Sequence, residues 1–151
     1  MHRVVISDTS CFIVLTNIGE LHLLQELYGE VITTPEVVAE FRHSLPDWVI
    51  IKTPSDNYRQ RILEIQIDKG EASAIALAIE IPGSTLILDD YKARIIAEKL
   101  GLKITGTLGV IIRAKLNGII PSVKPYLNKI KATSFRLTDE IENQALKEAG
   151  E

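Results

Sequence analysis

Two nearly continuous apolar runs in this chain each end in carboxylates. The first is Val4–Ser7, which is followed by Asp8, and the second is Leu86–Leu88, which is followed by Asp89 and Asp90. An uninterrupted apolar run bounded by polar residues is typical of a strand that is buried on both faces of a parallel sheet. Ligands bind such sheets outside the carboxyl ends of the strands. The two runs therefore predict that acids from separate strand ends meet in one crevice, as a metal site would require.

Two further acids lie on predicted helices. Glu40 comes three residues after Val37, at the border of the apolar stripe, where a partly buried carboxylate is costly unless it is paired or metal-bound. Glu71 opens an alanine-rich helix, and small side chains allow such a helix to approach a sheet closely. Simpler explanations exist for both, because border glutamates are usually surface residues and the helix dipole favours an acid in a first turn.

The aspartates also have structural explanations. Asp8 could cap the following helix, since Asp is a favoured N-cap residue. Asp89 and Asp90 repel each other, so at least one of them is expected to have a cationic partner, which could be a metal ion, Lys92 or Arg94. The sequence does not decide which of these two aspartates faces the crevice.

Four acids at strand ends and helix starts form the set of ligands that metal-dependent phosphodiester hydrolysis requires. Mg²⁺ or Mn²⁺ is the expected cofactor, because carboxylate oxygens suit hard cations. Zinc is disfavoured, since Cys11 is the only cysteine and the three histidines are scattered. The chain has no nucleophilic serine elbow and no P-loop. A turn at 106–109 could offer backbone N–H groups and the Thr107 hydroxyl to a phosphate.

Short strands must alternate with helices to position these acids. The pattern predicts strands at 4–7, 31–33, 48–51, 85–88 and 103–105. It predicts helices at 10–18, 20–28, 35–42, 57–67, 71–81, 91–100, 107–117, 122–131 and 138–149. Ser10 is the expected cap of the first helix, and Gly70 is expected to separate the fourth helix from the fifth. This order indicates a single α/β domain over residues 1–151, with a short, mainly parallel central sheet in a three-layer α/β/α arrangement.

Charge is unevenly distributed along the chain, although the net charge is only −3. Residues 1–90 hold 6 Lys/Arg and 14 Asp/Glu, whereas residues 91–136 hold 10 Lys/Arg and a single acid, Glu98. A concentrated basic region is the electrostatic footprint of a polyanion partner. The alternative is that these cations are solvated residues that balance the acidic first half.

Composition excludes several classes of protein. Hydrophobic residues make up 46% of the chain and charged residues 25%, which is ordinary for a globular domain. No stretch approaches the 18 or so apolar residues that a membrane span needs, and the start of the sequence lacks the pattern of a signal peptide. We therefore expect a cytoplasmic protein without a membrane association.

Five short motifs occur in a characteristic order. They are Ser7–Ser10, Val37–Glu40, Gly70–Ala78, Leu88–Asp90 and Ala93–Arg94. With these motifs the chain resembles the PIN-domain ribonucleases over nearly its whole length. It is most similar to an uncharacterised prokaryotic branch akin to the VapC-type toxins.

The resemblance implies an endoribonuclease that depends on Mg²⁺ or Mn²⁺. It also implies a toxin role with a cognate antitoxin protein, and commonly a homodimer. The implied metal-binding and catalytic residues are Asp8, Glu40, Glu71, and Asp89 or Asp90. Thr9, Ser10, Arg94 and Thr107 would be supporting polar groups, and the RNA backbone would be held by cations such as Lys92, Arg94, Lys103, Arg113 and Lys115.

The chain departs from the common family pattern at two positions, with Glu71 in place of an aspartate and Leu88 where many members have a threonine. The main rival interpretation is a catalytically inactive PIN-like module that binds RNA or a protein. A third interpretation is a phosphoacceptor or phosphatase-like domain. That class needs a lysine at a strand end, and Lys103 is a poor candidate because it begins its strand.

Overall fold

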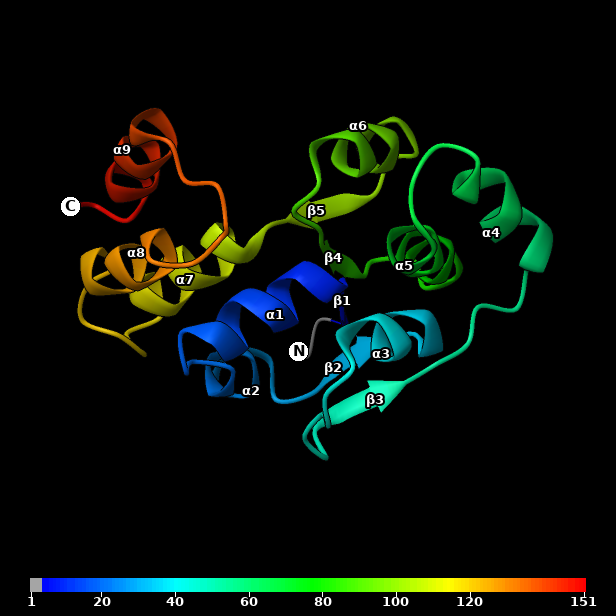
Figure 1. Ribbon diagram of the computed structural model, residues 1–151, viewed down its shortest axis with the longest axis horizontal. Helices are drawn as coiled ribbons and strands as arrows, with labels where there is room; N and C mark the ends of the chain where they lie inside the picture. Colours follow the sequence, from blue (N-terminus) through cyan, green and yellow to red (C-terminus); the bar gives the residue numbers. More distant parts are fainter. Residues whose placement is uncertain (1–3) are drawn as a thin grey trace.

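Five short strands form one parallel sheet at the centre of the computed structural model, which describes residues 4–151 (Figure 1). The strands are β1 (Val5–Ser7), β2 (Val31–Thr33), β3 (Val49–Ile51), β4 (Thr85–Ile87) and β5 (Lys103–Thr105). Their order across the sheet is β3-β2-β1-β4-β5, and every neighbouring pair is parallel. In the central strand β1, Ile6 lies opposite Ile32 on one side and Leu86 on the other.

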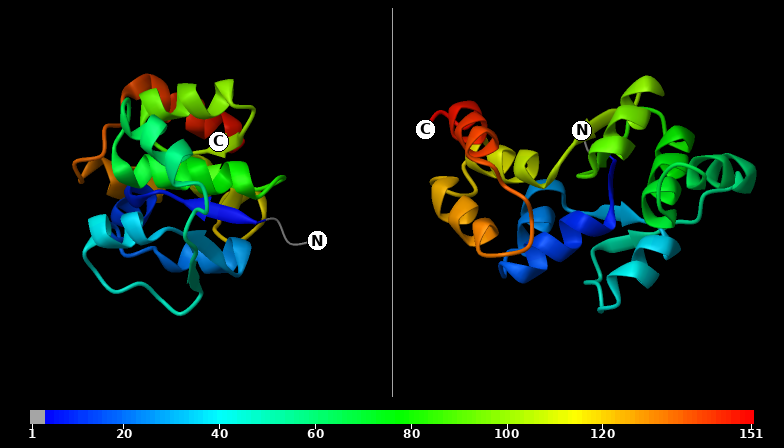
Figure 2. Two further views of the ribbon diagram at one scale, coloured as in Figure 1. Left: turned by 90° about the vertical axis from the view of Figure 1, so that its right-hand side faces the viewer. Right: turned by 45° about the horizontal axis from the view of Figure 1, so that its top comes forward.

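Helices cover both faces of the sheet (Figures 1 and 2). They are α1 (Thr9–Asn17), α2 (His22–Tyr28), α3 (Pro35–Phe41), α4 (Asn57–Glu64), α5 (Lys69–Glu80), α6 (Tyr91–Lys99), α7 (Thr107–Leu116), α8 (Lys124–Lys131) and α9 (Asp139–Glu148). Because side chains alternate along a strand, Val5 packs into one apolar core with α1 and α7, whereas Ile6 packs into a second core with α5 and α6. The expected three-layer α/β/α fold is confirmed, and within residues 4–151 the sheet is wholly parallel.

Local capping signals explain where several helices begin. Side chains of Asp or Thr accept a hydrogen bond from the backbone N–H three residues later at the starts of six helices: α1 (Asp8), α3 (Thr34), α4 (Asp56), α5 (Asp68), α6 (Asp90) and α9 (Thr138). Two expectations are corrected here. Asp8, and not Ser10, caps α1. Because Asp68 caps α5, Gly70 lies in the first turn of that helix and does not separate two helices.

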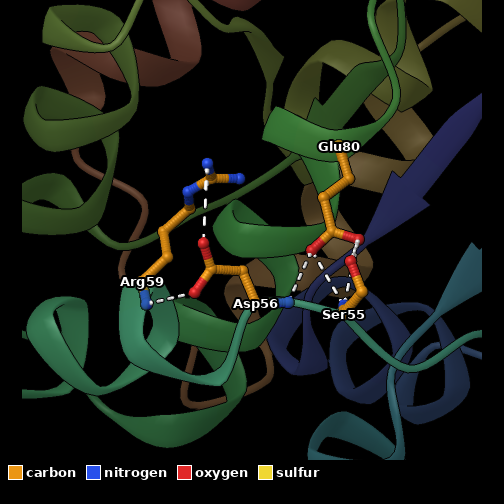
Figure 3. A network of polar contacts seen from close by, with 4 residues as sticks. All are labelled: Ser55, Asp56, Arg59 and Glu80. Carbon is orange, nitrogen blue, oxygen red and sulfur yellow. Dashed lines mark hydrogen bonds and ion pairs between the residues drawn. The ribbon is translucent and has the colours of Figure 1, made fainter.

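Helix α4 is held at its start by the carboxylate of Glu80, the last residue of α5 (Figure 3). The two oxygens of Glu80 accept hydrogen bonds from the backbone N–H of Ser55 at 3.0 and 2.9 Å, from the Ser55 hydroxyl at 2.7 Å and from the Asp56 N–H at 3.3 Å. Burial by itself would raise the pKa of Glu80, but these hydrogen bonds lower it below its usual value. This network ties the segment before α4 to α5.

Of the three apolar side chains of α4, Leu63 packs against the second core and the other two are exposed. Ile62 is 65% exposed and Tyr58 is 76% exposed, while Gln60 is buried and donates to Glu36. The predicted helix also ends earlier than expected, at Glu64. No helix within residues 4–151 is long and apolar enough to cross a membrane.

Candidate metal centre

The acids predicted from the sequence lie around the carboxyl ends of β1 and β4. Asp8 directly follows β1, and Asp89 comes two residues after β4. Since β1 and β4 are neighbours, the two aspartates meet. The Asp89 backbone N–H donates to Asp8 Oδ2 at 3.0 Å, and the Asp8 N–H donates to the Ile87 carbonyl at 3.1 Å. The convergence that the two apolar runs predicted is therefore present.

Asp8 is almost completely buried and has two backbone donors. It is 1% exposed, and its Oδ1 accepts the Cys11 N–H at 3.1 Å in addition to the bond from Asp89 to Oδ2. Burial raises the pKa of Asp8 well above its usual value, and the nearby charge of Asp89 raises it further. The capping interpretation of Asp8 is confirmed, but capping uses only one oxygen. The other oxygen points to the second strand end.

Asp89 is the aspartate that faces the crevice. Its Oδ1 accepts the Thr107 backbone N–H at 2.7 Å, and its Oδ2 accepts the hydroxyls of Ser10 at 2.7 Å and Thr107 at 2.5 Å. Asp90 is exposed and caps α6 through a bond from the Ala93 N–H at 2.9 Å. Ser10 and Thr107 thus orient the Asp89 carboxylate.

Glu71 lies in the first turn of α5, where other carboxylates surround it. Burial raises its pKa to about 7, and the charges of Asp68, Asp90 and Glu40 add to the rise. Asp68 was not predicted as part of this cluster. Its position just before a predicted helix, three residues from Glu71, could have indicated that the two carboxylates lie close together. Several carboxylates thus lie around Glu71, and no lysine or arginine within residues 4–151 forms an ion pair with it.

Glu40 differs from its expectation because it is exposed rather than partly buried. Its carboxylate nevertheless lies over the start of α5. A Cβ added at Gly70 would come within 2.9 Å of Glu40 Oε1 and 3.1 Å of Thr9 Oγ1. The absence of a side chain at Gly70 therefore leaves the space in which Glu40 and Thr9 approach the helix.

No lysine or arginine of residues 4–151 forms an ion pair with the five acids Asp8, Glu40, Glu71, Asp89 and Asp90. Lys92 and Arg94, which the sequence suggested as cationic partners of the two aspartates, do not form ion pairs with them. Arg94 Nη1 donates to the Leu88 carbonyl at 2.8 Å, and Lys92 is exposed. The Arg94 guanidinium lies near Asp89, since a Cβ at Gly106 would meet Arg94 Nη1 at 2.8 Å and Asp89 Oδ1 at 2.9 Å, but none of the five acids has a direct ion pair among the described residues. A bound metal ion would relieve the repulsion among them.

The residues present fit a hard divalent cation in their chemistry. Asp8, Thr9, Glu40 and Glu71 line one cavity of about 250 Å³, and all of them offer oxygen ligands. Thr9 is 6% exposed and its Oγ1 has no hydrogen-bond partner among the described residues.

The carboxylates of these acids do not surround one common position where a single ion could sit. Within residues 4–151, no three acidic, histidine or cysteine side chains are placed to hold one ion together. Asp8 and Asp89 are fixed by hydrogen bonds, whereas no side-chain hydrogen bond holds Glu40 or Glu71 in the described structure. Glu40 and Glu71 are therefore the acids of this set whose side chains are free to reorient.

Replacement of Glu71 by glutamine is expected to stabilise the protein in the absence of metal, and only at higher pH. A carboxyl group whose pKa rises on folding, here from 4.5 to about 7, makes the folded state lose stability as the pH increases through that interval. In EDTA, Glu71→Gln should melt at a higher temperature than the wild type at pH 8, and the gap should close by pH 5. The same substitution at the exposed and unpaired Glu98 is the control. Equal melting temperatures at pH 8 would contradict the crowding of charge around Glu71.

The predicted phosphate-binding cations are placed unevenly. Arg94 is half-buried and lines a larger groove together with Asp89, and Arg113 is exposed on α7. Lys103 is the first residue of β5, so it lies at the amino ends of the parallel strands, whereas the acids lie at the carboxyl ends. Lys115 donates to the Ala149 carbonyl and lies 3.8 Å from Glu151, so it holds the C-terminal residues in place. We leave Lys103 and Lys115 out of the proposed RNA-binding surface for these reasons.

Part of the basic region serves the structure itself. Lys124 and Lys131 both pair with the buried Glu142, and Lys129 pairs with Glu20 at 3.0 Å. The concentration of cations at 91–136 is therefore not one continuous patch for a polyanion.

No sequence pattern predicted that the segment between α8 and α9 lines the cavity that contains the acids. Thr133, Ser134 and Phe135 line the same cavity as Asp8 and Glu71. The adjacent aromatic and basic residues Phe135 and Arg136 are the only signal that could have drawn attention to this segment.

Cys11 also lies beside Asp8, and burial together with the charges of Asp89 and Asp8 raises its pKa well above the usual value, so it is a poor nucleophile.

A comparison with known families finds one that covers nearly the whole chain. A family model described as a PIN domain matches residues 4–151, which is nearly the whole chain. No curated protein matches the chain.

Proposed function

Because the chain belongs to the PIN-domain family, we propose that it is an endonuclease that hydrolyses RNA phosphodiester bonds with Mg²⁺ or Mn²⁺. PIN domains are generally nucleases. That the substrate is RNA and that the cofactor is Mg²⁺ or Mn²⁺ is what we propose for this chain. One observation carries it: five carboxylates lie at the carboxyl edge of the sheet and none of them forms a direct ion pair within residues 4–151.

Asp8, Glu40, Glu71 and Asp89 are the residues that would hold the metal, with Asp90 at the border of the site. When bound, such a cation neutralises the phosphate and lowers the pKa of a water that can attack it. The chain contributes orientation. Two backbone amides fix the Asp8 carboxylate, and Ser10 and Thr107 fix that of Asp89.

The carboxyl group of Glu71 gains and loses its proton near neutral pH. With a pKa of about 7, it is partly protonated in the metal-free protein at neutral pH. An ion that binds its carboxylate must displace that proton, so metal binding should strengthen between pH 6 and pH 8.

Metal addition and removal test the proposal directly. Mn²⁺ or Mg²⁺ should raise the melting temperature of the protein and allow it to cleave single-stranded RNA, and EDTA should reverse both effects. A ligand at 100 times its dissociation constant stabilises a folded protein by about 2.7 kcal/mol, which is easily seen in a melting experiment. NaCl at equal ionic strength is the control. RNA binding without any metal-dependent shift or cleavage would favour the rival interpretation of a catalytically inactive binding module.

The toxin role, the cognate antitoxin and the homodimer are further parts of the proposal that rest on the resemblance. Exposed apolar side chains on and just after α4 support the presence of a protein partner: Tyr58, Ile62 and Ile65 are 76%, 65% and 81% exposed. Light scattering measures the oligomeric state. Co-expression with the product of an adjacent gene, followed by growth and cleavage assays, tests inhibition.

A further inference from the structure

A groove of about 730 Å³ lies beside the acidic cluster, between α6 and α9. These two helices stand on the same side of the molecule, and the connection from β5 to α7 crosses the space between them (Figure 1). Asp89 lines the groove, so this space is continuous with the carboxyl edge of β4. The proposed function uses Asp89 alone among the residues of this groove.

Phe135 lies at the junction between the groove and the cavity that contains Asp8, because its side chain lines both. The ring is only partly buried against the core. The backbone around it is held in place, since the Phe135 N–H donates to Thr133 Oγ1 at 3.2 Å and that hydroxyl donates to the Ile130 carbonyl at 2.6 Å. A partly exposed aromatic residue on a hydrogen-bonded stretch of backbone thus lines the cavity that contains Asp8, Glu40 and Glu71.

Two arginines also line the groove, and neither forms an ion pair within residues 4–151. Arg136 is exposed and directly follows Phe135. Arg94 donates from Nη1 to a carbonyl, which leaves most of its five N–H groups for other acceptors. The wall formed by α9 carries Glu140 and Glu148, which repel phosphates. Because Asp89 also lines the groove, the acids of the groove outnumber its cations, and a polyanion there must be held by direct contacts with Arg94 and Arg136.

We propose that the groove binds an unpaired segment of the RNA substrate, with one base stacked on Phe135 and the adjoining phosphates held by Arg94 and Arg136. This inference rests on the proposed function and specifies its substrate as single-stranded. A base within a duplex is already stacked on both faces and cannot cover the Phe135 ring. Stacking of a base on an aromatic side chain depends little on sequence, so the contact selects unpaired nucleotides and not a particular base.

Binding of a fluorescent oligoribonucleotide that contains 2-aminopurine tests the inference in EDTA, where no cleavage is needed. The wild-type protein should bind the single strand and change its fluorescence, and should bind the corresponding duplex more weakly. Phe135→Leu, which keeps apolar volume but lacks the ring, should weaken single-strand binding by roughly 5- to 150-fold. Phe135→Tyr, which keeps the ring, should bind like the wild type.

Tyr58→Leu is the matched control, because it removes an exposed aromatic ring on α4, at the opposite end of the molecule from α9 (Figure 1). It should leave binding unchanged, and melting curves should show that every variant is folded. Equal binding by Phe135→Leu and the wild type, or equal binding of duplex and single strand, would overturn the stacking role while leaving metal-dependent cleavage intact. If the wild type binds single-stranded RNA but shows no metal-dependent cleavage, the groove assignment stands and the nuclease assignment fails. If it binds no RNA, the groove assignment is overturned.

Discussion

Replacement of Asp8 by asparagine is expected to abolish RNA cleavage while the protein stays folded. Asparagine preserves the shape of the side chain and remains a favoured N-cap residue, so α1 keeps its start. It removes a negative charge that burial and Asp89 already make costly, which offsets the loss of one of the two acceptor oxygens. The change therefore removes a proposed metal ligand at little cost to the fold.

The expected loss of activity is large. Substitutions of groups that merely orient metal ligands typically cost about 10- to 100-fold, so the loss of a ligand should cost at least about 100-fold. The measurement is the initial rate of single-stranded RNA cleavage with saturating Mn²⁺, together with the melting temperature. Asp47→Asn is the matched control because Asp47 is exposed and precedes β3, away from the acids. Retained metal-dependent cleavage by Asp8→Asn would remove Asp8 from the active site.

Replacement of Thr107 by valine is expected to lower cleavage by about 10- to 100-fold through Asp89. Valine has nearly the same shape as threonine but cannot donate the 2.5 Å hydrogen bond to Asp89 Oδ2. The backbone N–H of residue 107 and the hydroxyl of Ser10 would still hold the carboxylate, so its position loosens but is not lost. A hydrogen bond to a charged group contributes roughly 1.5–3 kcal/mol, which sets the expected loss of stability.

The matched variant for this prediction is Thr107→Ser, which keeps the hydroxyl and should retain most of the activity. The two variants should also differ in the concentration of Mn²⁺ needed for half-maximal activity, since a loosened ligand binds the ion more weakly. Steady-state cleavage rates across a Mn²⁺ titration give both quantities. If valine and serine variants behave alike, the orientation of Asp89 by the Thr107 hydroxyl does not matter for the reaction.

The elements of this fold could be predicted closely from local sequence. The strand β2 and the strand β5 begin and end where the apolar pattern placed them, and β1, β3 and β4 agree to within a residue at either end. Parallel pairing also followed from the alternation of strands and helices. These features are predictable because apolar runs, prolines and glycines act on the nearest few residues. The start of α5 was misplaced, since the capping of that helix by Asp68 outweighed the tendency of Gly70 to interrupt it.

The sequence by itself determined that Asp8 and Asp89 would lie near each other, because residues that follow neighbouring parallel strands lie at the same edge of the sheet. Only the tertiary structure decided that Asp89 faces the crevice and Asp90 caps α6, since that choice depends on donors from Ser10 and Thr107, which lie far from β4 in the sequence. It also decided that Phe135 lines the same cavity as Asp8, although most of the chain separates the two residues in sequence. Side-chain contacts between distant segments depend on how the layers pack, and no local pattern encodes that packing.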